Sequence, residues 1–114
     1  MNGNLQCALN EAGARVAFHY PWWLRPFLQR GVIGIALGRR IYIAPEMLER
    51  PAAEVERLVR HELAHVRQVA RLGLVRFLWR YLVEYLALRR RGLTSSAAYN
   101  AISFEREARE AEEA

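Results

Sequence analysis

The sequence predicts a single domain of the α+β class, in which a short antiparallel or mixed sheet is followed by about three helices. The first half of the chain carries short β-branched and apolar runs that are separated by glycine and proline, and the second half carries long stretches of helical periodicity. A length of 114 residues allows one hydrophobic core and little more. We therefore expect one domain over residues 1–114.

The predicted strands come first along the chain. Residues 1–14 are weakly patterned, and we expect either a loose segment or a short helix there. The pattern of residues Arg15–Tyr20 predicts a short strand. Val32–Leu37 and Arg40–Ala44 flank the pair Gly38-Arg39, and a Gly-X pair between two such runs favours a hairpin with glycine at its first central position.

Two long helices are predicted next. The first opens at Arg50-Pro51 and runs to Leu72, and Gly73 provides a natural end. The second runs from Leu74 to about Arg91 and is apolar nearly all round. Such a helix is usually buried on several sides, so we expect it to form the core of the helical half. A partner surface or a membrane surface is the alternative.

A third helical stretch begins near Thr94 or Ser95, either of which can cap it. A break near residues 100–103 would divide this stretch, with Ser103 as the cap of a last helix that carries Glu105 and Glu107.

Composition limits the partners and the metal sites. All 17 basic residues are arginine and all 12 acidic residues are glutamate, with a net charge of +5. The arginines are spread along the whole chain, so nucleic acid is not the partner that we predict. The single cysteine, Cys7, excludes an internal disulfide and a four-thiolate zinc site. The oligomeric state stays open.

Neither a secretory signal nor a membrane span is predicted, and we expect a cytoplasmic protein. Trp22, Trp23, Leu24 and Phe27 would allow attachment to a membrane surface. We expect instead that they belong to a core or lid segment.

The motif that carries chemistry is H-E-x-x-H at residues 61–65, on the first long helix. Residues four apart on a helix lie about 40° apart around its axis and about 6 Å apart, so His61 and His65 can reach one metal ion from the same side. Zinc accepts imidazole nitrogen at about 2.0–2.1 Å, which suits this spacing. Glu62 would act as the general base toward a metal-activated water.

The position of Glu62 on the helix favours a functional role. At about 100° per residue, Glu62 points from the middle of the apolar arc, whereas the arginines of this helix lie on the opposite side. A carboxylate on a buried face is costly unless it is paired or belongs to a site. The alternative is an ordinary helix with two satisfied histidines.

Two histidines do not complete a catalytic zinc site, which normally has three protein ligands and an open position. No third histidine follows His65, so the remaining candidates are carboxylates downstream: Glu84, Glu105 and Glu107. Residues two apart on a helix point about 200° apart, so only one of Glu105 and Glu107 can face the metal.

The segment H-E-L-A-H-V-R-Q at residues 61–68, followed by F-E-R-E-A at residues 104–108, resembles the gluzincin branch of zinc metallopeptidases, and especially the minimal bacterial and archaeal minigluzincins. In that family a glutamate on a later helix, often in E-x-x-A-D, is the third ligand. The resemblance implies Glu105 as this ligand, with Ala108 in the pattern. Arg109 stands where the family has aspartate, so the residue that orients His61 is not assigned.

The resemblance also implies a zincin-like fold and an activity. The chain would bind one zinc ion through His61, His65 and Glu105, and would hydrolyse peptide bonds of a peptide or unfolded protein with zinc-activated water. An edge strand of the sheet would pair with the extended substrate. By chain order this strand comprises Val32, Ile33, Gly34, Ile35, Ala36 and Leu37.

Several alternatives stay open. The hairpin at residues 32–44 is equally consistent with a purely structural role. Tyr99 is a candidate for donating a hydrogen bond to the transition-state oxyanion, and a core tyrosine is the competing interpretation. A zinc-binding scaffold or partner-binding protein without turnover is the first rival function. A basic, aromatic module for membrane surfaces or nucleic acid is the second.

Overall fold

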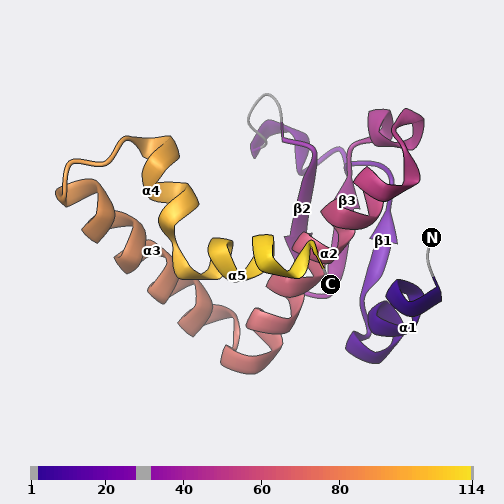
Figure 1. Cartoon of the computed structure of the whole chain (residues 1–114), viewed down its shortest axis with the longest axis horizontal. Coiled ribbons are helices and arrows are strands. Elements are labelled where there is room, and N and C mark those ends of the chain that lie inside the picture. Colours follow the sequence, from indigo (N-terminus) through magenta and orange to yellow (C-terminus); the bar gives the residue numbers. More distant parts are fainter. Residues whose placement is uncertain (1–2, 28–31, 114) are drawn as a thin grey trace.

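A small mixed sheet and an N-terminal helix form one half of the molecule, and helices alone form the other (Figure 1). This computed structural model describes residues 3–27 and 32–113. The sheet holds β1 (Arg15–Ala17), β2 (Gly34–Leu37) and β3 (Arg40–Ile43) in the order β1-β3-β2. β1 pairs with β3 in parallel and β2 pairs with β3 antiparallel, so the predicted α+β class with a mixed sheet is confirmed.

The hairpin of β2 and β3 turns at Gly38-Arg39, as the sequence predicts. Leu37 pairs with Arg40, and Gly38 has a φ of 62°, a value that glycine adopts without steric cost. β2 is shorter than the predicted strand, because Val32 and Ile33 lie outside it. The ladder ends with Ile43 since the chain then turns into a short 3₁₀ helix, η2 (Pro45–Glu49), leaving only a bond from Ala44 N–H to the carbonyl of Ile33.

Of the two alternatives for the N-terminal segment, a loose segment or a short helix, the structure shows the helix, α1 (Gly3–Ala12). Residues 1 and 2 of that segment lie outside the described ranges. Leu5 and Leu9, about one helical turn apart, are buried in a common core with Ile41 and Ile43 of β3. This burial fixes the helix that its weak pattern left undecided. β1 also ends earlier than predicted, at Ala17, and a 3₁₀ helix, η1 (Arg25–Phe27), follows.

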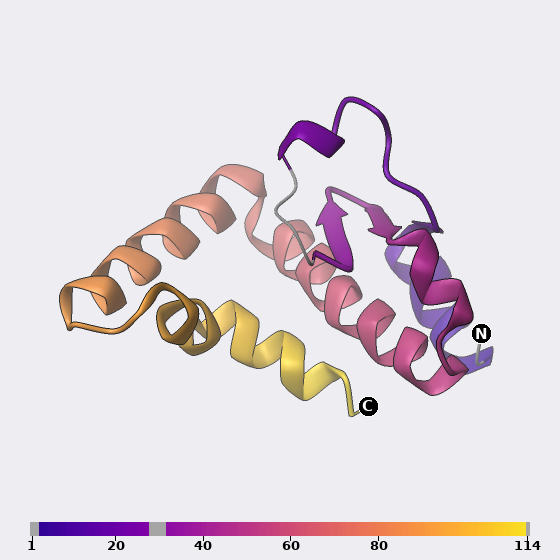
Figure 2. The same ribbon diagram turned by 90° about the horizontal axis from the view of Figure 1, so that it is seen from above.

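The longest helix, α2 (Ala52–Leu72), connects the two halves (Figure 2). Val59, Leu63 and Val66 join the core that α1 and the sheet share. Val69 and Leu72, near the other end of α2, pack instead on a second cluster around Phe77, Ile102 and Phe104. α2 ends at Gly73, as predicted, and its central turns lie between the two cores.

Three further helices follow α2, namely α3 (Leu74–Arg90), α4 (Ser95–Ala101) and α5 (Ser103–Ala111). Thr94 caps α4 by accepting the N–H of Ala97 at 3.1 Å, which confirms one of the two predicted caps. The predicted break near residues 100–103 is also present. The expected cap of the last helix is wrong, because Ser103 is already its first residue.

A carboxylate from a neighbouring helix caps α5 instead of Ser103. Glu84 on α3 accepts the backbone N–H of Ser103 at 2.8 Å and its hydroxyl at 2.8 Å. A carboxylate at a helix N-terminus satisfies a donor that has no partner within the helix and interacts favourably with the helix dipole. Through these two hydrogen bonds Glu84 connects α3 to the N-terminus of α5.

α3 is not the buried core of the helical half that its composition predicts. Phe77 is its one buried residue in the structure, and large apolar side chains of α3 are exposed, Val75 at 81% and Trp79 at 67%. The reason is that α2 and α4 pack on α3 on the side of Phe77, where Phe104 of α5 also contacts it, and no described element covers the other side (Figures 1 and 2). None of the helices in the described ranges is long and apolar enough to cross a membrane.

Candidate metal centre

The packing of α5 on α2 brings His61, His65 and Glu105 together. Both histidines lie in the middle of α2, and Glu105 lies in the first turn of α5. Ala108, one turn after Glu105, is fully buried, and its small side chain lets the two helices approach closely. Three side chains from two helices therefore converge although 40 residues separate His65 from Glu105 along the chain.

The ligand atoms of this cluster lie within 4.8 Å of one another. The Oε1 atom of Glu105 is 2.8 Å from Nε2 of His65 and 3.5 Å from Nε2 of His61. The two imidazole rings are 5.1 Å apart between centroids. Both histidines thus turn the same nitrogen, Nε2, toward one carboxylate.

Gln68 orients His65 from the other side of its ring. Nδ1 of His65 donates to Oε1 of Gln68 at 2.8 Å. The amide nitrogen of Gln68 donates to the carbonyl of Phe104 at 3.0 Å and to Oε1 of Glu107 at 3.3 Å, so the orientation of this fully buried amide is determined. A proton on Nδ1 leaves the lone pair of Nε2 available to a metal ion.

Glu112 orients His61 through Nδ1, as Gln68 orients His65. Nδ1 of His61 donates to Oε2 of Glu112 at 2.8 Å, and Arg60 donates to the backbone carbonyl of Glu112 at 3.4 Å. An acidic run such as residues 110–113 is usually solvated, but Glu112 is half-buried and paired with His61. The spacing is the signal for this role, because Glu112 follows Glu105 by seven residues, about two helical turns, although α5 itself ends at Ala111.

The other carboxylates considered as ligands lie elsewhere. Glu107 forms an ion pair with Arg71 at 3.7 Å in addition to its contact with Gln68, and Glu84 caps α5. Arg109, which occupies the position of the aspartate in the gluzincin pattern, donates to the backbone carbonyl of Asn100 at the end of α4. The structure thus places Glu105 with the histidines and Glu107 away from them.

The electrostatics of the cluster are those of an anion between two imidazoles. Burial alone would raise the pKa of Glu105, but hydrogen bonds and charge from His61 and His65 lower it to about 2. Burial alone would lower the pKa of His61, and the carboxylates of Glu105 and Glu112 raise it to about 9. The pKa of His65 is raised against its burial in the same way, chiefly through its hydrogen bond with Glu105.

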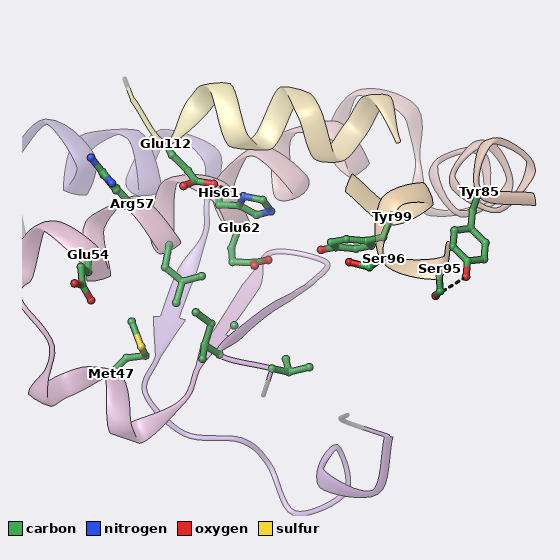
Figure 3. A pocket seen from close by; sticks show the side chains of 14 residues that line it. Met47, Glu54, Arg57, His61, Glu62, Tyr85, Ser95, Ser96, Tyr99 and Glu112 are labelled. Carbon is green, nitrogen blue, oxygen red and sulfur yellow. Dashed lines mark hydrogen bonds and ion pairs between the residues drawn. The ribbon is translucent and has the colours of Figure 1, made fainter. Parts of the chain in front are cut away.

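Glu62 lies beside the cluster without a partner in the described part of the chain. Its side chain is buried, and burial raises its pKa although the neighbouring histidines act to lower it. Glu62 lines two cavities, of about 960 Å³ and about 550 Å³, that meet at this residue, Gly34 and Tyr99. In Figure 3 the carboxylate of Glu62 lies just below the ring of His61 and points to the side on which Tyr99 lies.

The two cavities differ in chemistry. The larger one contains charged and hydroxyl side chains, including Glu54, Arg57 and Ser96 (Figure 3). The smaller one extends along β2 and is walled by apolar side chains of α2 and α3, including Val69, Leu74, Phe77 and Leu78. Gly34 lies where the cavities meet, and a Cβ atom there would come within 3.1 Å of Leu58.

Tyr99 reaches the cluster from α4. Its hydroxyl donates to Oε1 of Glu105 at 3.0 Å, and its side chain is 46% exposed. Burial of the hydroxyl, followed by the charge of Glu105, raises the pKa of Tyr99, so that the hydroxyl keeps its proton. The tyrosine is therefore a hydrogen-bond donor at the border of both cavities, and the competing interpretation as a core tyrosine does not fit its exposure.

A divalent metal ion suits this donor set. The buried Oε2 of Glu105 has no hydrogen-bond partner within the described ranges, which is costly for a carboxylate oxygen and is resolved by a cation. Two imidazoles and one carboxylate form one of the ligand sets of catalytic zinc sites. Each histidine also has the partner on Nδ1 that metal-binding histidines usually have.

Comparison with known protein families gives a match to part of the chain. A family model described as the eCIS core domain matches residues 29–73, a segment that carries β2, β3 and α2 with His61, Glu62 and His65. Glu105 and Glu112 lie outside the matched segment. No curated protein matches the chain, and no solved structure does.

Proposed function

We propose that the protein is a zinc-dependent metallopeptidase, with His61, His65 and Glu105 as the ligands of one zinc ion. One observation supports this proposal: ligand atoms of His61, His65 and Glu105 lie within 4.8 Å of one another. Beside them the buried Glu62, which has no hydrogen-bond partner among the described residues, lines a cleft. The resemblance of residues 61–68 and 104–108 to gluzincins supports the same ligands.

The chain's own residues would divide the work as follows. Zinc, when bound, supplies a Lewis acid for water and for the substrate carbonyl. Glu62 accepts the proton of the attacking water and returns it to the leaving amine, and its raised pKa suits that exchange. Tyr99, a protonated donor at the border of both cavities, would hydrogen-bond the oxyanion.

The substrate would be an extended peptide that pairs with β2, which is an edge strand of the sheet. Its pairing residues are Gly34–Leu37, because Val32 and Ile33 lie beyond the strand. A peptide antiparallel to β2 would place its N-terminal part in the apolar cavity and its C-terminal part in the polar one. A cytoplasmic location is part of this proposal.

The test is hydrolysis of an unfolded protein such as casein by the zinc-loaded chain. We expect cleavage by the wild type and a loss of about 10²–10⁴-fold in Glu62→Gln, which keeps the metal but cannot accept the proton. Glu56→Gln, on the same helix and outside both cavities, should cleave like the wild type. A zinc-loaded wild type that cleaves nothing would favour the non-catalytic zinc scaffold instead.

A further inference from the structure

The outer face of α3 is an exposed apolar surface that no function assigned above uses. We define this outer face by five exposed side chains, which are Val75, Trp79, Leu82, Val83 and Leu86. Monomeric soluble proteins seldom expose so many large apolar side chains on one helix, and such a face usually marks an interaction surface.

Most of the outer face lies away from the rest of the molecule, and at its edge Trp79 and Val83 border a cavity that they share with Ser103 and Phe104 of α5. Phe77, Tyr81 and Leu88 turn α3 toward the second core, and the outer face lies on the opposite side of the helix. In both ribbon views α3 borders the molecule on the side away from α1 (Figures 1 and 2). The helix could therefore lie flat on another surface without disturbing its contacts with α5.

The charged residues of α3 indicate which kind of surface the outer face would contact. Arg76 and Arg80 are exposed on the flank between the outer face and the buried side, and Arg89 and Arg90 end the helix. Glu84 is the one acidic residue of α3, and both of its carboxylate oxygens are engaged by Ser103. The helix thus combines an apolar stripe with uncompensated positive charge.

We propose that α3 is an interfacial helix that docks the domain on an anionic lipid surface. Its apolar stripe would enter the boundary between headgroups and acyl chains, Trp79 would occupy the level that tryptophan prefers, and the arginines would reach the phosphates. A second copy of the chain is a poorer occupant, because pairing two such faces would bring the arginines of both copies together without carboxylates to offset them.

The experiment is co-sedimentation of the full chain with vesicles of phosphatidylcholine alone or of an equimolar mixture with phosphatidylglycerol. We expect binding to the mixed vesicles that weakens as salt rises, and little binding to phosphatidylcholine. Val75→Glu combined with Leu82→Glu should abolish the binding. Leu48→Glu combined with Ala53→Glu, two exposed positions away from α3 with the same change of charge, should bind like the wild type.

A second pair of variants separates charge from apolar burial. Arg76→Gln combined with Arg80→Gln leaves the outer face intact, and we expect about fivefold weaker binding to mixed vesicles for each arginine removed. Light scattering in the absence of vesicles completes the test. The proposal is overturned if the wild type ignores mixed vesicles, if the control pair loses as much binding as the α3 pair, or if the chain forms a dimer that the α3 pair dissociates.

Discussion

Each histidine of the candidate centre has its own partner on Nδ1, and the two partners come from different sources. Gln68 lies on the same helix as His65, three residues later, and is fully buried. Glu112 comes from the last turn of the described chain and is half-buried. The orientation of each histidine therefore depends on the docking of α5, because Gln68 is itself held by the carbonyl of Phe104 and by Glu107.

Glu112→Ala should weaken zinc binding. Removing the acceptor of the His61 Nδ1 proton frees the ring to rotate, and loss of such a partner typically costs about 10–100-fold in metal affinity. Glu113→Ala is the matched control, because Glu113 is exposed and its nearest basic group, on Arg57, is 3.9 Å away. Titration of both variants with zinc measures the difference, and equal affinities would remove Glu112 from the site.

Glu105→Ala should weaken zinc binding by more than Glu112→Ala does, since it removes a ligand rather than the partner of one. Glu107→Ala should bind zinc within a few-fold of the wild type, because Glu107 contacts the amide of Gln68 and Arg71. The two affinities can be compared by competition with a chelator. If Glu107→Ala loses the metal and Glu105→Ala keeps it, the assignment of the third ligand is wrong.

At the residue scale, the sequence predicts what helical geometry alone determines. The spacing of His61 and His65 and the buried side of Glu62 follow from about 100° per residue. Glu112 escaped prediction because an acidic run at the end of a helix is usually solvated. Its role depends on the helix against which α5 packs, and that information lies in the tertiary contacts.

At the element scale, α5 decides whether the centre forms. It brings Glu105, and Glu112 directly after it, to α2, and the contacts that hold it there include the cap from Glu84, the hydrogen bond from Gln68 to the carbonyl of Phe104, and the packing of the buried Ala108. The elements themselves were largely predictable, since glycine and proline mark their ends. The exposure of α3 was not, because periodicity shows which face is apolar but not how many layers cover it.

Ala108→Leu tests this role of α5. A larger side chain at a fully buried position between α2 and α5 should cost about 1–3 kcal/mol of stability and displace Glu105 from the histidines. We therefore expect lower zinc affinity together with a lower midpoint of urea unfolding. Ala53→Leu, at an exposed position of α2, should change neither quantity. Unchanged zinc affinity in a destabilised Ala108→Leu would mean that the centre does not depend on this close approach.

On the scale of the whole molecule, two small cores share one helix. The core of α1, the sheet and α2 holds one end of α2, and the cluster around Phe77 and Phe104 holds the other. His61, Glu62 and His65 lie between these cores, where the apolar and polar cavities meet. Because the two cores pack on opposite ends of α2, a cleft remains beside the middle of this helix, where the three motif residues lie.

The central claim is that His61, His65 and Glu105 bind one zinc ion. The most direct measurement is calorimetric titration of the metal-free, folded wild type with zinc, alongside Glu105→Ala. The account predicts saturation at about one zinc per chain in the wild type and much weaker binding in the variant. Two results would contradict this claim. The first is a wild type that is folded by circular dichroism and binds no zinc, and the second is a Glu105→Ala variant whose zinc affinity equals that of the wild type.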